Sequence, residues 1–456
     1  MFTKILVVAM LLISATAANA QEKVTFANLS AKKTTKIDTL KSDTVSTEKK
    51  LASPAPKKDD AAWTPTRRLW GYAFGDEYYA PHVPGNNNYG GETMYNGVPS
   101  NRNAFQFRRL YLGYDYDINQ KFSAEVLLAS EPNANTGTIT GASSNIQNGD
   151  NLVDGKMSFW IKNFNLRVRE VWAGTDLVVG EMGTPGFALN EPGSNGPNSL
   201  SEATWGYRFI EKTITDMHKN NSYDVGAALQ GTFDTKTKNF GYVFMIANNT
   251  TSTLASATSP ATGFYKIFYG DLWGKFLDKK LYIDIYSHYA PTGQATAATG
   301  GQSQAMYKIF ASYNTKPLSV GVEAYTQTFQ NGVVSAAHGV QNATVNGLSF
   351  WLKGNFNSTW GWFARYDTYN PYTNYDPSVS AYTIQTTYGS YNAAATEYKE
   401  QFITAGLDFQ PAPKIHFSPN LWYMNYKDQR DAATTGYTGN DHTLVLRATF
   451  FYTFGK

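Results

Sequence analysis

The segment Leu281-Tyr-Ile-Asp-Ile-Tyr-Ser-His-Tyr289 decides the fold class of this chain. Its odd-numbered positions are mainly apolar, whereas its even-numbered positions carry Tyr, Asp and His. Successive side chains of a β-strand point to opposite faces, so this pattern indicates a strand with one apolar face and one mixed polar face. The same alternation recurs in residues 318–327 and 443–454. The sequence therefore predicts a protein built from half-buried strands.

Sixteen segments of this kind follow one another from residue 68 to the end of the chain. They cover residues 68–79, 102–117, 120–130, 156–172, 176–183, 222–233, 238–247, 264–275, 279–289, 304–313, 318–329, 347–356, 360–370, 400–409, 414–425 and 442–454. The connections after even-numbered strands have two to four residues, and those after odd-numbered strands have 14 to 38. Transmembrane barrels sort their connections in this way, because the periplasmic turns are short and the external loops are long. We expect an all-β, 16-stranded antiparallel transmembrane β-barrel over residues 67–456, with 18 strands as the alternative.

The composition excludes several other classes of protein. Charged residues make up 16% of the 456 residues, and no apolar run beyond the first 20 residues approaches the roughly 20 that a membrane helix needs. This excludes a helical membrane protein, and the absence of Cys excludes a disulfide scaffold or a thiolate metal site.

Hydrocarbon offers no partner to unpaired backbone groups, so strands in a membrane must close into a barrel. A barrel of sixteen strands is wide enough to hold water.

The first 66 residues differ from the strand region. Residues 1–20 have the charged, apolar and small-residue order of a secretory signal peptide that is cleaved after Ala20. Residues 21–66 are rich in Lys, Thr, Ser and Pro and poor in apolar residues, which predicts a disordered periplasmic tail. We expect this tail to be a plain linker or a contact with peptidoglycan or a periplasmic partner. Residues 1–62 carry 10 Lys and six acidic residues, so the positive charge of the chain resides there and gives no reason to expect nucleic-acid binding.

Three stretches of sequence carry a family resemblance. They are Trp70-Gly-Tyr-Ala-Phe-Gly-Asp76, Phe107-Arg-Arg-Leu-Tyr-Leu-Gly-Tyr-Asp-Tyr116 and Trp205-Gly-Tyr-Arg-Phe-Ile-Glu-Lys-Thr-Ile214. These stretches look like outer-membrane porins of the Bacteroidetes type, and the strand number is similar to that of general diffusion porins. The resemblance implies a homotrimer in the bacterial outer membrane, in contact with lipid and lipopolysaccharide, that passes small hydrophilic solutes.

The longest connection, residues 184–221, follows the fifth predicted strand. In general porins the corresponding loop folds into the lumen and narrows it, and the resemblance implies the same here. The charged residues of this loop are candidates for the constriction, and its aromatic residues are interpreted as solute contacts or as anchors that fix the loop to the wall. The charged candidates are Glu202, Arg208, Glu211, Lys212 and Asp216, and the aromatic candidates are Trp205, Tyr207 and Phe209. An ordinary charged surface loop is the alternative.

The arginine residues suggest a basic wall opposite this loop. Eight of the 11 Arg residues lie at or before position 208. Alternation with neighbouring apolar residues places Arg109, Arg167 and Arg169 on the lumen side, although residues 157–161 indicate the opposite parity earlier in the strand of Arg167. A basic wall that faces acidic loop residues produces a transverse field, which favours polar, oriented solutes.

These observations predict passive diffusion of small hydrophilic solutes and ions through a water-filled lumen. Three alternatives stay open: a saccharide-specific channel that stacks sugar rings on aromatic residues, an anion porin, and a structural protein that tethers the envelope through its tail. None of the six His residues lies in a catalytic motif, and no metal-ligand spacing or phosphate-binding loop is present. We therefore expect neither an enzyme nor a bound cofactor or metal.

Overall fold

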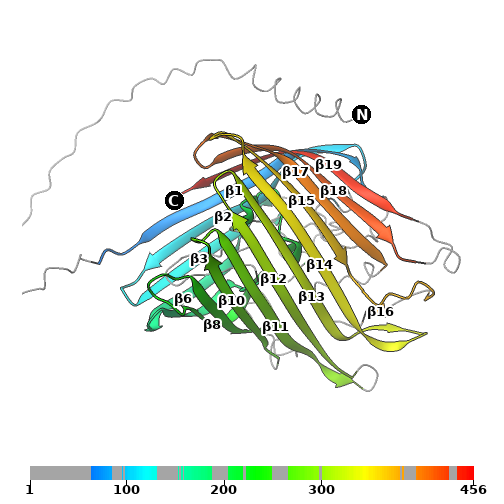
Figure 1. Cartoon of the computed structure of the whole chain (residues 1–456), viewed down its shortest axis with the longest axis horizontal. Helices are drawn as coiled ribbons and strands as arrows, with labels where there is room; N and C mark the ends of the chain where they lie inside the picture. The colour runs from blue at the N-terminus through cyan, green and yellow to red at the C-terminus, as the bar shows by residue number, and fades with distance from the viewer. Residues whose placement is uncertain are drawn as a thin grey trace, which may run out of the picture. The chain divides into compact units, whose positions relative to one another are not determined.

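The computed structural model shows a closed antiparallel β-barrel in the unit Pro65–Lys456 (Figure 1). The structure describes residues 63–84, 95, 98–130, 152–153, 156–157, 159–186, 204–218, 222–248, 265–296, 300–379, 383–384, 397–430 and 439–455. The predicted signal peptide and residues 21–62 of the predicted tail lie outside these ranges. Within the described ranges, no helix is both long enough and apolar enough to cross a membrane.

Sixteen strands, counted over the described residues, form the wall of the barrel. They are β1 (Arg67–His82), β2 (Arg102–Asp117), β3 (Phe122–Ser130), β6 (Trp160–Trp172), β7 (Thr175–Gly183), β8 (Tyr223–Thr232), β9 (Phe240–Ala247), β10 (Ile267–Phe276), β11 (Leu281–Thr296), β12 (Gly300–Asn314), β13 (Leu318–Ser335), β14 (Gly339–Asn355), β15 (Trp360–Asn370), β17 (Tyr398–Ala412), β18 (Ile415–Asp428) and β19 (Asp441–Phe454). Neighbours in this order are antiparallel, and β1 also pairs with β19, which closes the sheet. Three short strands lie outside the wall sequence: β4 (Leu152–Val153) pairs with β5 (Lys156–Met157), and β16 (Thr383–Ile384) pairs with β13.

The prediction of sixteen strands is confirmed, and the alternative of eighteen is not. Each predicted segment overlaps one wall strand, and β2 and β15 have the predicted bounds. The alternation of side chains sets these bounds, because a strand that separates an apolar exterior from a polar interior must keep its period of two.

Two of the predicted long loops are wrong. Only three residues separate β11, which ends at Thr296, from β12, which begins at Gly300, and only three separate β13 from β14, in place of the predicted loops 290–303 and 330–346. Gly, Pro and Asn residues of these two segments lie in strands with register shifts, such as the one around Asn331, which has a φ of 52°. A β-bulge accommodates such residues without ending the strand. Short turns therefore lie at one end of the barrel. Of the eight connections at the other end, six are long as predicted.

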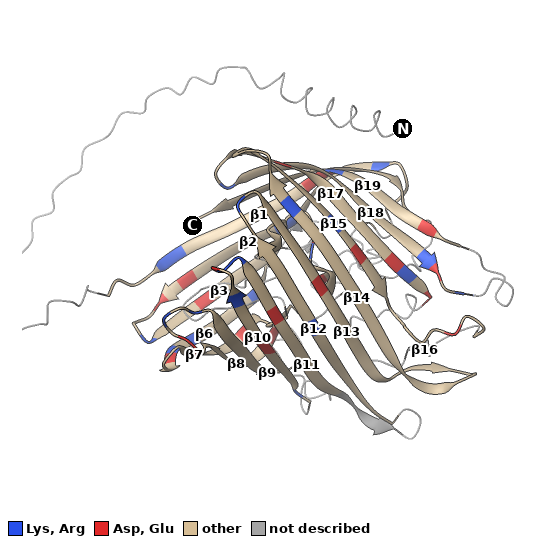
Figure 2. Cartoon of the chain, in the orientation of Figure 1, with Lys and Arg blue, Asp and Glu red and all other residues tan. Residues whose placement is uncertain are grey.

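The two faces of the wall differ in polarity. Ile285 of β11 is 56% exposed, whereas Asp284 beside it is 3% exposed. Leu272 of β10 lies opposite Ile285 and is also exposed, and its neighbour Asp271 is buried. Figure 2 shows charged residues at isolated positions along otherwise uncharged strands. The outer face is apolar and the inner face carries the polar groups, as the alternation predicts.

Candidate channel constriction

Part of the connection between β7 and β8 lies against the inner face of the wall. The longest described stretch of this connection comprises residues 204–218, which we call the inner segment. The Trp205 ring centroid lies 5.3 Å from that of Trp351 and 5.9 Å from that of Phe363, and all three side chains are buried. Trp351 points inward, because its neighbour Phe350 is 47% exposed on the outer face. The inner segment therefore packs on lumen-facing side chains of β14 and β15.

Two further aromatic residues of the inner segment pack on the wall. The ring of Tyr207 lies 4.7 Å from that of Phe363, and the ring of Phe209 stacks on Phe451 of β19 at 4.5 Å. Stacked or tilted aromatic pairs at such distances contribute beyond their buried area. Trp205, Tyr207 and Phe209 therefore occupy one apolar cluster with the wall, in the arrangement that anchors require.

The backbone of the inner segment is a turn followed by one helical turn. Gly206 has a φ of +70°, a conformation that glycine adopts without strain, and a Cβ there would approach Lys353 Nζ to 2.5 Å. The Ile210 amide donates to the Tyr207 carbonyl at 2.7 Å, and α3 (Ile214–Met217) follows. This compact path leaves the carbonyl groups of Phe209, Ile210 and Lys212 available to side chains of the wall.

Arg108 of β2 binds two of these carbonyl groups. Its Nη1 donates to the Ile210 carbonyl at 2.9 Å, its Nη2 donates to the Phe209 carbonyl, and its Nε lies 2.9 Å from Asp76 Oδ2. Residue 108 is the extra residue of a bulge, because Phe74 faces Arg109 and the next residue of β1 faces Phe107. The bulge turns both Arg108 and Arg109 inward, where both are buried.

Arg365 of β15 and Arg447 of β19 hold the next residues of the inner segment. Arg365 donates to the Lys212 carbonyl, and Arg447 Nη1 lies 3.5 Å from Glu211 Oε2. Burial raises the pKa of the Glu211 carboxyl, but the charges of Arg447 and Arg108, the hydrogen bond from the Lys212 amide and the charge of Arg365 outweigh it, so the pKa lies below its ordinary value. Glu211 is therefore an anion held by three arginines from separate strands of the wall.

The remaining charged candidates of the inner segment pair with one another. Arg208 forms an ion pair with Asp216, whose Oδ1 also accepts a hydrogen bond from the Ser222 hydroxyl at 2.7 Å. Burial raises the pKa of Asp216, but Arg208, Lys212 and Arg109 together hold it well below its usual range. The structure thus brings Arg109, Arg208, Lys212 and Asp216 together. Glu202 lies outside the described residues.

The other two predicted arginines lie elsewhere. Arg167 faces inward and donates to Asp176 Oδ2 and Gln230 Oε1, each at 3.0 Å. Arg169 forms an ion pair with Asp117 and donates to main-chain carbonyls of the short turn after β2. A cavity of about 620 Å³ opens at this end of the barrel, lined by Gln120, Lys121, Arg169, Glu170, Gly174, Asp176, Thr232, Thr235 and Lys238. Arg167 and Arg169 therefore belong to the short-turn end and not to the contacts of the inner segment.

Sequence reasoning missed three of the arginines that hold the inner segment. The bulge breaks the alternation of two at Arg108, so the pattern did not place this residue on the inner face. A second bulge at Lys162 explains why the exposed positions change from odd to even numbers along β6. Arg365 and Arg447 lie outside the arginine-rich half of the chain. Their alternation with apolar neighbours is the signal that could have found them.

Solved structures of outer-membrane porins and channels have a similar architecture. No protein-family model matches the sequence, and no curated protein matches it either. An anion-selective porin from Comamonas acidovorans is 12% identical with a TM-score of 0.52, and the match covers 86% of this chain and 100% of that one. The outer membrane channel DcaP of Acinetobacter baumannii is 11% identical with a TM-score of 0.53, and the match covers 86% of this chain and 97% of that one. At these identities the matches establish that the chain has the barrel fold of these porins.

Proposed function

We propose that this protein is a porin of the bacterial outer membrane, without enzymatic activity, that passively conducts small hydrophilic solutes and ions. The opposition between exposed Ile285 and buried Asp284, repeated around the wall, carries this proposal. An apolar exterior suits acyl chains, and a polar interior suits water. The barrel fold shared with porins supports it.

The inner segment is the proposed constriction. Its own charged residues balance, because Glu211 and Asp216 offset Arg208 and Lys212. Such a balance suits general diffusion better than strict selection by charge. The aromatic side chains also favour general diffusion over a saccharide-specific channel. Trp205, Tyr207 and Phe209 pack on the wall and offer little free surface to a sugar ring.

An anion channel is the second candidate. Arg108, Arg109, Arg365 and Arg447 all face the interior, and one structural neighbour is described as an anion-selective porin. A pore lined by arginine favours anions once the paired carboxylates no longer balance the field.

We include in the proposal the homotrimer, the contacts with lipid and lipopolysaccharide and the relation to Bacteroidetes porins, which rest on resemblance. The tethering role of residues 21–66 stays a prediction.

Recordings of single channels in planar bilayers test this function. The folded protein should give an ohmic current that sugars do not block, and a reversal potential in a salt gradient that reports only weak ion preference. A saturable block by oligosaccharides would favour the saccharide channel, and a strong anion preference would favour the anion porin. A correctly folded protein that never conducts would contradict the proposal.

A further inference from the structure

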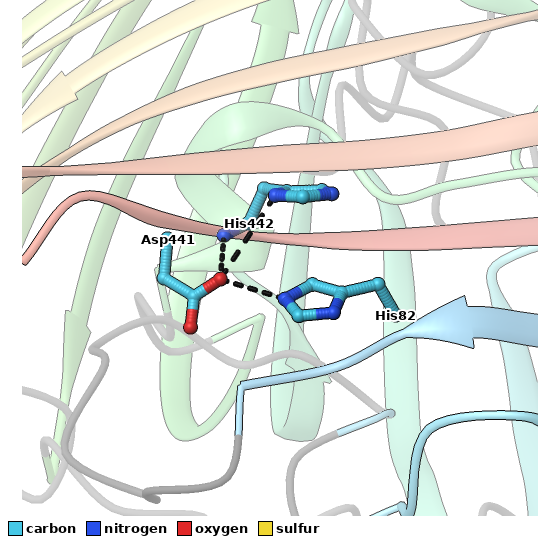
Figure 3. A group of neighbouring side chains, drawn as sticks. All are labelled: His82, Asp441 and His442. Carbon is cyan, nitrogen blue, oxygen red and sulfur yellow. Dashed lines mark hydrogen bonds and ion pairs between the residues drawn. The ribbon is translucent and has the colours of Figure 1, made fainter.

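The first and the last strand of the barrel bring two histidines and an aspartate together. His82 lies at the end of β1, and Asp441 and His442 begin β19 (Figure 3). The His82 Nε2 lies 2.7 Å from Asp441 Oδ1, and the same oxygen accepts a hydrogen bond from the His442 amide at 2.7 Å. The two imidazole rings stack with their centroids 4.4 Å apart. Closure of the barrel alone creates this cluster, because the residues lie at opposite ends of the strand region.

The cluster lies at the end of the barrel that carries the long connections. The connections 83–101 and 429–440 leave from β1 and β18 at this end, whereas the short turns lie at the opposite end. In the proposed membrane orientation this is the external mouth. The conduction pathway proposed above does not require the cluster, so the inference goes beyond that function.

The donor atoms suit a divalent transition metal. One ligand atom from each residue lies within 4.8 Å of the others, and His442 Nδ1 is 3.9 Å from Asp441 Oδ1. Bonds of about 2.0–2.2 Å to zinc place neighbouring ligands roughly 3.0–3.6 Å apart. The side chains are between 28% and 42% exposed, so small rotations can bring all three donors to these distances. Two imidazole nitrogens and one carboxylate select zinc, copper or nickel over calcium and magnesium, which prefer all-oxygen sites.

We propose that His82, Asp441 and His442 bind one divalent transition-metal ion of the zinc type and thereby clasp the first strand to the last at the external mouth. The two imidazoles and one carboxylate oxygen of Asp441 supply three ligands, and water completes the coordination. The ion replaces the hydrogen bond between His82 and Asp441 and requires both imidazoles to be neutral.

Calorimetric titration of Zn²⁺ into the folded, tag-free protein in detergent tests the proposal. The unaltered chain should bind one equivalent, and His82→Ala, Asp441→Asn or His442→Ala should each weaken the affinity at least about tenfold. His338→Ala is the matched control. His338 forms a similarly exposed pair with Asp376, with Nε2 2.7 Å from Oδ2, but among the described residues no third His, Asp or Glu donor lies close enough to complete a metal site there. This variant should bind zinc as the unaltered chain does.

A second measurement separates loss of the site from loss of the fold. Electron paramagnetic resonance of bound Cu²⁺ should report two imidazole nitrogens in the unaltered chain and one in His442→Ala, with the variant folded as judged by heat-dependent migration in gels. Zinc affinity that is absent from the unaltered chain, or unchanged in His82→Ala, would overturn the proposal.

Discussion

Arg447 of the last strand lies with its Nη1 3.5 Å from Oε2 of Glu211, a residue 236 positions earlier in the chain. Both side chains are almost completely buried. The pair joins the inner segment to β19, the strand that closes the barrel by pairing with β1. If the inner segment is the constriction proposed above, loss of this pair should change both the stability and the pore width.

Replacing Arg447 by Met should destabilise the protein by about 3 kcal/mol. Removing one member of a buried ion pair costs about 3–5 kcal/mol, because the remaining charge loses its partner. The lower value applies here because Arg108 and Arg365 still act on Glu211. Equilibrium unfolding in urea measures the free energy, and the double variant Arg447→Met, Glu211→Gln should recover part of the loss. Arg430→Met removes the less buried pairs with Glu397 and Asp428 and should cost less than Arg447→Met; equal costs for the two arginines would contradict the anchoring role.

Replacing Trp205 by Ala should widen the pore. The side chain is 1% exposed and packs on Trp351 and Phe363, so its truncation should cost about 3–5 kcal/mol and release the inner segment from the wall. Single-channel conductance should rise, while the response to added sugars should not change. Trp360→Ala is the control, because Trp360 is 36% exposed. A sugar block that disappears in Trp205→Ala would instead identify this residue as a solute contact.

The loop after β15 should lose an ion pair in acid. Hydrogen bonds from Ser378 and from His338 lower the pKa of Asp376 to about 2, from a model-compound value of 3.8. A carboxyl with a depressed pKa in the folded state stabilises the loop at a pH above 3.8, and this contribution is lost as the pH falls toward 2. Limited proteolysis between pH 5 and pH 2 should show cleavage near Asp376 only at the acid end. In Asp376→Asn the susceptibility should no longer change with pH over this range.

The sequence was sufficient to predict the barrel but only some of the residues that contact the inner segment. Strict alternation in segments such as Leu281–Tyr289 reflects a physical requirement of every strand, so the number and order of the wall strands could be predicted. Bulges have no such local pattern, and this is why Arg109 was predicted to face the lumen while Arg108 was not. The same reason explains the two overpredicted loops, because the strand β13 continues through the register shift at Asn331.

Contacts between distant segments were the least predictable feature. Arg365 and Arg447 bind the inner segment only because the closed barrel places β15 and β19 beside it. The cluster of His82, Asp441 and His442 depends on the same closure. A sequence pattern describes which face a residue occupies but not which residues meet across the lumen, so three-dimensional structure was needed for both.

Neutralising the acidic side chains of the inner segment should shift the channel toward anions. In Glu211→Gln, Asp216→Asn, the positive charges of Arg447 and Arg208 lose the carboxylates that balance them. A change of roughly one kT in the local potential, well within the range that protein charges produce, changes the ratio of anion to cation permeability several-fold. The reversal potential in a tenfold gradient of potassium chloride measures this ratio. Asp234→Asn serves as the control, because Asp234 lies on an exposed short turn and its removal should leave the reversal potential unchanged. If both variants gave the same reversal potential as the unaltered protein, the inner segment would not line the conduction path, and the constriction would have to be sought among other residues.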